Sequence, residues 1–228
     1  TAGILSGTPL QADVGTHSIE VTASDGTLTV ADTFVLTVTN TADAPTIDST
    51  AVTAVDEDAA YTYTVTASDD DGDTLTLDAT TLPGWASFDA TTGVLSGTPL
   101  NADVGDNAVV ITASDATATA TQSFTIVVTN TNDATTGAVT VSGDAYDDEV
   151  LTAVTTALAD DDGMGTFTYQ WANQDGDITG ATSSTYTIPS CSAATSTSCS
   201  VMGDTFTVTV VHTDATSVAQ TMTASAAT

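Results

Sequence analysis

The stretch Gly93-Val-Leu-Ser-Gly-Thr-Pro-Leu-Asn-Ala-Asp-Val-Gly105 repeats, with few changes, the earlier stretch Gly3-Ile-Leu-Ser-Gly-Thr-Pro-Leu-Gln-Ala-Asp-Val-Gly15. The match continues without a gap: at an offset of 90 residues, 25 of the 45 positions in residues 1–45 are identical to their counterparts in 91–135. A repeat of about this length is the size of one β-sandwich domain. The sequence therefore predicts a tandem array of such domains.

Strands are the expected element throughout. Tyr61–Ala67, Phe34–Thr39 and Thr205–Val210 alternate apolar residues with Thr at period two, as half-buried antiparallel strands do. Turn signals such as Asp71-Gly72 and Pro83-Gly84 separate these runs. The abundance of Thr and the scarcity of aromatic residues also favour strands over helices. We predict an all-β chain of tandem β-sandwiches.

The two copies differ in what comes before the shared stretch. The second copy has 45 preceding residues, Thr46–Ala90, whereas the first has only Thr1 and Ala2. Half a sandwich would leave one apolar face uncovered and a sheet edge unpaired. Residues 1–45 are therefore either the C-terminal half of a repeat whose front lies in further sequence or a half-domain completed by another chain.

The charge is one-sided: the chain has 30 acidic residues, no Lys or Arg, and a formal charge of -30. Nucleic-acid binding needs cations that displace phosphate counterions, so this partner class is excluded. Polybasic membrane docking and phosphate-cradling chemistry are excluded for the same reason. No apolar run is long enough to insert into a membrane. Hydrophobic residues make up 41% of the chain, so it can still bury a core.

Catalysis has little support, and we expect no enzyme. Ser, His and Asp are present, but no Gly-x-Ser-x-Gly elbow occurs, and His17 and His212 lie far apart in strand-like segments. Paired carboxylates can serve a glycosidase, yet such sites need aromatic walls, and aromatic residues are only 5% of this chain.

Residues 1 to about 134 resemble dystroglycan-type cadherin-like repeats, the Ig-like modules found in tandem in large bacterial and archaeal surface proteins. The resemblance implies an extracellular, calcium-dependent β-sandwich, and in tandem a rod of Ig-like or cadherin-like domains. It is carried by five segments of residues 46–134, which is predicted to be a complete repeat: Val55-Asp-Glu-Asp58, Ala67-Ser-Asp-Asp-Asp-Gly-Asp73, Leu82-Pro-Gly-Trp-Ala-Ser-Phe-Asp89, Thr92-Gly-Val-Leu-Ser-Gly-Thr-Pro99 and Val128-Thr-Asn-Thr-Asn-Asp133.

Residues 135–228 resemble a different Ig-like repeat of the same class of adhesins. Segments such as Asp160-Asp-Asp-Gly163, Tyr169-Gln-Trp171 and Thr185-Tyr-Thr-Ile188 carry this likeness. Trp171 would be the core tryptophan of a central strand. The two cysteines, Cys191 and Cys199, bracket a small polar loop, and in an oxidising extracellular setting we expect a disulfide between them.

Carboxylates are the only abundant reactive groups, and they gather in turns and linkers. Calcium takes six to eight oxygen ligands, including carboxylates, Asn side chains and backbone carbonyls, so Ca²⁺ is the expected ion. Asp-rich turns can also be simple solvated turn formers. Asp175-Gly-Asp177 is read as a hairpin turn, and Leu100-Asn-Ala-Asp103 supplies one carboxylate where cadherins have two.

The cadherin resemblance implies two calcium-binding junctions. The first would use Asn40, Asp43, Asp69, Asp71 and Asp115, with the carbonyl of Ala42. The second would use Glu57, Asn130, Asn132, Asp133, and Asp160 or Asp162.

The leading functional hypothesis is a structural segment of an extracellular adhesin or cell-surface fibre, stiffened by calcium and serving cell adhesion or a biofilm matrix. Its partners would be neighbouring repeats or subunits of the same fibre, with surface glycans or other cells as further candidates. One alternative is a subunit of a self-assembling filament completed by strand exchange between chains. Another is a carbohydrate-binding module of a secreted protein, for which Trp85, Phe88 and Tyr146 are the candidate platform.

Overall fold

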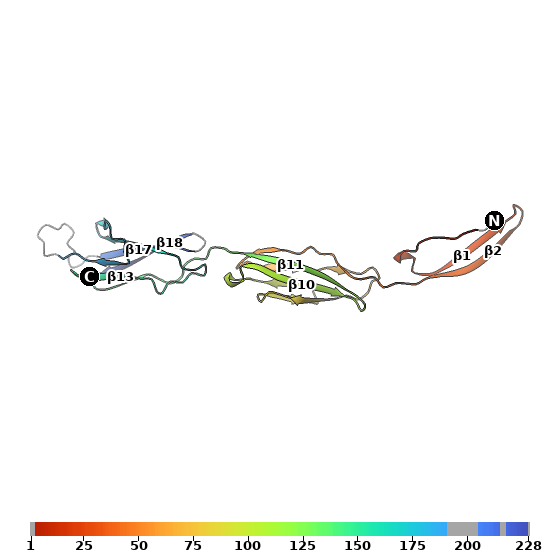
Figure 1. Ribbon diagram of the computed structural model, residues 1–228, viewed down its shortest axis with the longest axis horizontal. Coiled ribbons are helices and arrows are strands. Elements are labelled where there is room, and N and C mark those ends of the chain that lie inside the picture. The colour runs from red at the N-terminus through yellow and green to blue at the C-terminus, as the bar shows by residue number, and fades with distance from the viewer. Residues whose placement is uncertain (1–2, 191–204, 215–217, 228) are drawn as a thin grey trace. The chain divides into compact units, whose positions relative to one another are not determined.

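The computed structural model describes residues 3–190, 205–214 and 218–227, and its regular elements are strands with two short 3-10 turns (Figure 1). The chain divides into two compact units, Thr1–Asn130 and Thr131–Thr228, which are described separately below. The all-β prediction is confirmed. No helix in the described part of the chain is long and apolar enough to cross a membrane.

The first unit begins with an antiparallel hairpin. The 3-10 turn η1 (Gln11–Asp13) leads into β1 (Gly15–Ser24), which pairs with β2 (Thr29–Val38) along its whole length. Asp25 forms the turn between them, because its Oδ1 accepts the backbone amides of Thr27 and Leu28. Among the described residues, no third strand joins this sheet.

The rest of the first unit is a two-sheet sandwich with a small β3–β6 pair beside it. The turn η2 (Asn101–Asp103) precedes β10, as η1 precedes β1. The larger sheet has the order β4 (Ala54–Asp56), β11 (Thr119–Thr129), β10 (Gly105–Ser114), β7 (Thr76–Thr81); the smaller has β5 (Tyr61–Thr64), β9 (Val94–Gly97), β8 (Ala86–Asp89); and β3 (Thr46–Ile47) pairs with β6 (Ala67–Ser68).

Alternate residues of the facing sheets meet in the core of this sandwich. Tyr61 and Tyr63 from one sheet pack with Ile111 and Ile126 from the other, and Leu95 is completely buried among them. The ring of Tyr61 stands edge-on to Trp85, at 5.7 Å between centroids and 84° between planes. Burial of alternate residues is the arrangement that period-two patterning predicts.

The predicted strand Tyr61–Ala67 is divided in the structure. Its first part, β5, pairs with β9, and its last part, β6, pairs with β3. Between them the amide of Val65 donates to the carbonyl of Gly93 at 2.8 Å. The strand breaks because its two ends pair in different sheets. The pattern of apolar residues does not indicate which strand each end pairs with.

The second unit is also a two-sheet sandwich. Thr136 and Ala159 form an isolated bridge next to it. One sheet has the order β12 (Thr140–Ser142), β13 (Val150–Val154), β16 (Thr185–Thr187), and the other β15 (Gly176–Asp177), β14 (Phe167–Asn173), β17 (Thr205–Thr213), β18 (Ala219–Ala227).

Trp171 is at the centre of the second sandwich and has no exposed surface. Its indole Nε1 donates to the carbonyl of Ser183 at 2.9 Å, and its ring stacks on Tyr186 at 6.0 Å. Leu151 and Val208 complete the core from the two sheets. The prediction of a core tryptophan on a central strand is confirmed.

The repeat provides a matched test of the core. Leu95→Ala should lower the free energy of unfolding of its sandwich by about 2 to 5 kcal/mol, because it removes a fully buried side chain. Leu5 is the aligned residue of the first repeat but is 67% exposed, so Leu5→Ala should change stability by less than about 0.5 kcal/mol. Denaturant unfolding of the full chain followed by far-ultraviolet circular dichroism measures both, and equal losses would contradict the assignment.

Candidate metal centres

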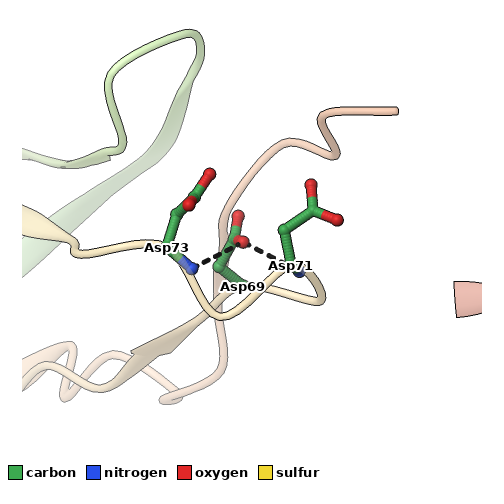
Figure 2. Close-up of side chains that lie close together, drawn as sticks. All are labelled: Asp69, Asp71 and Asp73. Atoms are coloured by element: carbon green, nitrogen blue, oxygen red, sulfur yellow. Dashed lines mark hydrogen bonds between the residues drawn. The ribbon is translucent and has the colours of Figure 1, made fainter. Parts of the chain in front are cut away.

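The loop after β6 brings three carboxylates together. Asp69 Oδ1 accepts the backbone amides of Asp71 at 2.9 Å and Asp73 at 3.2 Å, which folds the loop around the first carboxylate. Gly72 has a φ of 74°, a left-handed conformation that glycine adopts without strain. One oxygen from each of Asp69, Asp71 and Asp73 lies within 4.8 Å of the other two (Figure 2). We call these three residues the first acidic loop.

The linker before β3 contacts this loop. The backbone amide of Asp43 donates to Oδ2 of Asp71 at 2.6 Å. The contact follows from strand pairing, because Thr46 of β3 lies opposite Ser68 of β6, just before Asp69. The structure therefore brings together three of the residues predicted for the first junction, while Asn40 of the same prediction is exposed two residues after β2.

Asp115 lies at the same end of the sandwich, in the turn between β10 and β11. Ser114 pairs with Thr76, the first residue of β7 after the acidic loop. The amides of Ala118 and Thr117 donate to Asp115 Oδ1, and these bonds hold the pKa of its carboxyl below the ordinary value. Its other oxygen, Oδ2, is buried without a hydrogen-bond partner.

Two further carboxylate oxygens share that condition, Asp69 Oδ2 and Asp71 Oδ1. A buried carboxylate oxygen is costly unless a donor or a cation satisfies it. No Lys or Arg exists in the chain to do so. All the possible metal ligands in this loop are hard oxygen atoms, and oxygen ligands suit calcium better than a softer metal. The first acidic loop thus fits a divalent cation on its chemistry and on its unsatisfied oxygens.

The second unit contains the same loop. Asp160-Asp-Asp-Gly163 has the sequence of Asp69-Asp-Asp-Gly72, and Gly163 has a φ of 91°. The amide of Asp162 donates to Asp160 Oδ1 at 3.0 Å, and the amide of the linker residue Asp133 donates to Asp162 Oδ2 at 2.7 Å. Oxygens of Asp160, Asp162 and Asp214 lie within 4.8 Å of one another. We call these three residues the second acidic cluster.

Asp160 differs from Asp69 in having its second oxygen occupied. Its Oδ2 accepts the hydroxyl of Thr135 at 2.7 Å and the side-chain amide of Gln220 at 3.2 Å. The buried His212 places Nε2 at 3.2 Å from the same oxygen. In the second acidic cluster, hydrogen-bond donors of the protein therefore already satisfy an oxygen that a metal ion would otherwise bind. The first acidic loop is the better cation site.

The remaining predicted ligands are divided between the units. Glu57 and Asn130 belong to the first, where Glu57 is buried and its amide donates to the carbonyl of Thr129 at 3.0 Å. Asn132 belongs to the second, and its side-chain amide donates to the carbonyl of Asp133 at 3.0 Å. Asp103, the one carboxylate of Leu100-Asn-Ala-Asp103, accepts the amide of Leu100 at 2.9 Å in η2.

Sequence reasoning missed Asp73 and Asp214. The signal for Asp214 was present, because the sequence Asp214-Ala-Thr216 repeats Asp115-Ala-Thr117, and Asp214 directly follows β17 as Asp115 directly follows β10. Asp175-Gly-Asp177 lies in the β14–β15 hairpin, and the amide of Asp175 donates to Asn173 Oδ1 at 3.0 Å. Cys191 and Cys199, with the disulfide expected between them, lie outside the described residues.

Residues 44–129 match a family model described as "Putative Ig domain". Residues 44–129 form an Ig-like domain. No curated protein sequence matches the chain.

Several solved structures align with the chain at TM-scores below 0.5. Cadherin domains 1–4 of protocadherin gamma B7 align over 96% of this chain and 58% of their own, with 15% identity and a TM-score of 0.47. An endo-fucoidan hydrolase of glycoside hydrolase family 107 aligns over 97% and 35%, with 22% identity and a TM-score of 0.37. Domains A168–A170 of titin align over 96% and 76%, with 12% identity and a TM-score of 0.35. This chain thus spans about a third of the hydrolase, and no activity is carried over from these proteins.

The turn aspartates give a pH prediction. The amides of Leu28 and Thr27, with the Thr27 hydroxyl, lower the pKa of Asp25 from 3.8 to about 2. A lowered pKa means that the carboxylate supports the hairpin fully above pH 3.8 and loses that support as the pH falls through about 2. A carboxyl NMR titration should give a midpoint near 2. In Asp25→Asn the NMR chemical shifts of the Thr27 and Leu28 amides should show no step near pH 2. A wild-type midpoint near 3.8 would contradict the capped turn.

Proposed function

We propose that this chain is a non-enzymatic structural segment of an extracellular surface protein, an adhesin or a fibre, in which calcium binds at the Asp-Asp-Asp-Gly loops. The observation that carries the proposal occurs in both units. The amide of the linker residue before each sandwich, Asp43 or Asp133, is bound by the third Asp of the loop, Asp71 or Asp162. A cation on either loop would therefore also hold the linker that leads into that sandwich.

Electrostatics supports a cation at the first acidic loop. Two carboxylates with oxygens within 4.8 Å of each other repel by at least about 1 kcal/mol at the dielectric constant of water and about 3 kcal/mol at that of a protein surface. The chain has a formal charge of -30 and no Lys or Arg, so no Lys or Arg side chain offsets this repulsion. The Debye length is about 8 Å at physiological ionic strength, so the carboxylates of one loop are not screened from each other.

The Ig-like domain at residues 44–129 supports a structural or adhesive role. The resemblance to dystroglycan-type cadherin-like repeats supports the extracellular location, where calcium is abundant enough for sites of modest affinity. Calcium on each linker would limit its bending, and a series of such repeats would then transmit force along a fibre.

The carbohydrate-binding alternative receives no such support. Trp85 and Phe88 pack against the core of the second repeat, and Trp85 Nε1 donates to Asn107 Oδ1 at 3.1 Å. Of the three aromatic candidates only Tyr146 is exposed. A sugar platform needs several exposed rings on one face, so we do not propose this function.

Calcium binding can be tested with a matched pair of variants. Asp69→Asn removes a charge but keeps an oxygen that can accept the amides of Asp71 and Asp73, so the loop should fold while calcium affinity falls at least about tenfold. Asp106→Asn removes the same charge from an exposed residue at the opposite end of β10 and should leave affinity within about twofold. Isothermal titration with CaCl₂ compares them. Equal affinities, or no calcium binding by the wild type, would overturn the site.

Stiffening needs a separate measurement. Small-angle X-ray scattering of the full chain in calcium should give a larger radius of gyration and a narrower distribution of maximum dimensions than in chelator. Asp69→Asn in calcium should resemble the wild type in chelator, because its linker is no longer held by an ion. If calcium binds to the wild type but the two scattering curves coincide, the ion has a local role and the stiffening proposal fails.

A further inference from the structure

The hairpin β1–β2 presents an uncovered apolar face. Val21 is 51% exposed and Leu36 is 45% exposed, whereas the aligned residues of the second repeat, Ile111 and Ile126, have no exposed surface. Leu5 and Leu95 differ in the same way, at 67% and 0%. The apolar character of these positions is retained between the repeats, but their burial is not.

The second repeat shows what covers the equivalent face. Residues 93–129 form its back half, with β9, β10 and β11, and residues 46–92 form its front half. From the front half, Tyr61, Tyr63 and Val65 pack onto Leu95, Ile111 and Ile126. The front half also pairs with both outer strands of the back half, because β7 joins β10 and β4 joins β11.

The first repeat has the same local structure as the back half of the second repeat. Leu10 donates its amide to Asp13 Oδ2 at 2.9 Å, as Leu100 does to Asp103. The hairpin register is identical, since Gly15 pairs with Val38 as Gly105 pairs with Val128. These contacts are internal to the back half, so they form without a partner.

The first repeat differs from the second in two features that depend on a front half. Residues 4–7 are not a strand, whereas the aligned β9 is held between β5 and β8, both of which are front-half strands. A cavity of about 610 Å³ lies between residues 5–9 and the exposed face of the β1–β2 hairpin. It is lined by Leu5, Pro9, Ile19 and Leu36 among others.

We propose that the β1–β2 face and residues 3–10 bind a second front half, a polypeptide of the type of residues 46–92. This occupant would place aromatic side chains equivalent to Tyr61 and Tyr63 on Val21 and Leu36. It would add strands to both edges of β1–β2 and convert residues 4–7 into a strand by pairing on both sides. The interface would continue the one that already exists within the second repeat.

The occupant cannot be residues 46–92 themselves and has to be a further front half. Residues 1–228 contain two back halves, 3–39 and 93–129, and one front half, which the second back half already uses. An exchange of residues 46–92 between two copies would cover one face by exposing another. Pairing of two hairpins face to face would bring two chains of charge -30 together and would leave both outer strands without partners.

A graft tests this occupant directly. A second copy of residues 46–92 is fused before Thr1 of the full chain, and amide hydrogen exchange in β1–β2 is measured by mass spectrometry. The ungrafted hairpin should exchange quickly, because two-stranded sheets are marginally stable. In the graft, exchange should slow at least about a hundredfold and approach that of β10–β11.

The control is Leu36→Asp, which puts a charge into the proposed interface. It should leave exchange in the ungrafted chain unchanged and abolish the protection in the graft. If the graft does not fold, a separate peptide of residues 46–92 added to the full chain should protect β1–β2, although more weakly. Absence of protection in both experiments overturns the proposal. So does protection of the ungrafted hairpin that depends on chain concentration, since a second copy would then be the occupant.

Discussion

The buried and turn-forming carboxylates of this chain must be satisfied without Lys or Arg, and much of the local structure follows from that constraint. At Asp25 and Asp115, backbone amides of the turn take this role, which lowers the pKa values of both groups and closes both hairpins. At Asp160, a hydroxyl, a side-chain amide and His212 take it. At the first acidic loop such donors do not suffice, and buried oxygens of Asp69 and Asp71 have no hydrogen-bond partner.

The two acidic centres show how one loop sequence can have different chemistry in different settings. Asp-Asp-Asp-Gly folds in the same way at 69–72 and 160–163, because Asp69 and Asp160 accept equivalent amides and the glycines take the left-handed conformation. What differs is the surrounding fold. In the second unit Thr135, Gln220 and His212 reach the first carboxylate from the linker and the last two strands, whereas Asp69 Oδ2 has no such neighbours. The cost of binding an ion therefore depends on strands distant in sequence.

The repeated back half separates local from tertiary stability in a similar way. Its turn, hairpin register and capping aspartate are the same in both repeats, since each depends on contacts between neighbouring residues. Burial is different in the two because it requires an opposing sheet. Ile111 is enclosed and Val21 is open, although both residues are β-branched and occupy the same position of the same strand.

The sequence alone determined the all-β class, the repeat and the Trp171 core position, because period-two patterning and turn chemistry are local properties. The grouping of Asp43, Asp69 and Asp71 was implied by the resemblance to cadherin-like repeats. It did not reveal that the strand predicted at Tyr61–Ala67 divides between two sheets, since the pairing partners lie tens of residues away. Nor did it place Asp214 beside Asp160 and Asp162, or show which carboxylate oxygens remain buried without donors. Those outcomes belong to the tertiary structure, because they depend on which distant strands the folded chain sets side by side.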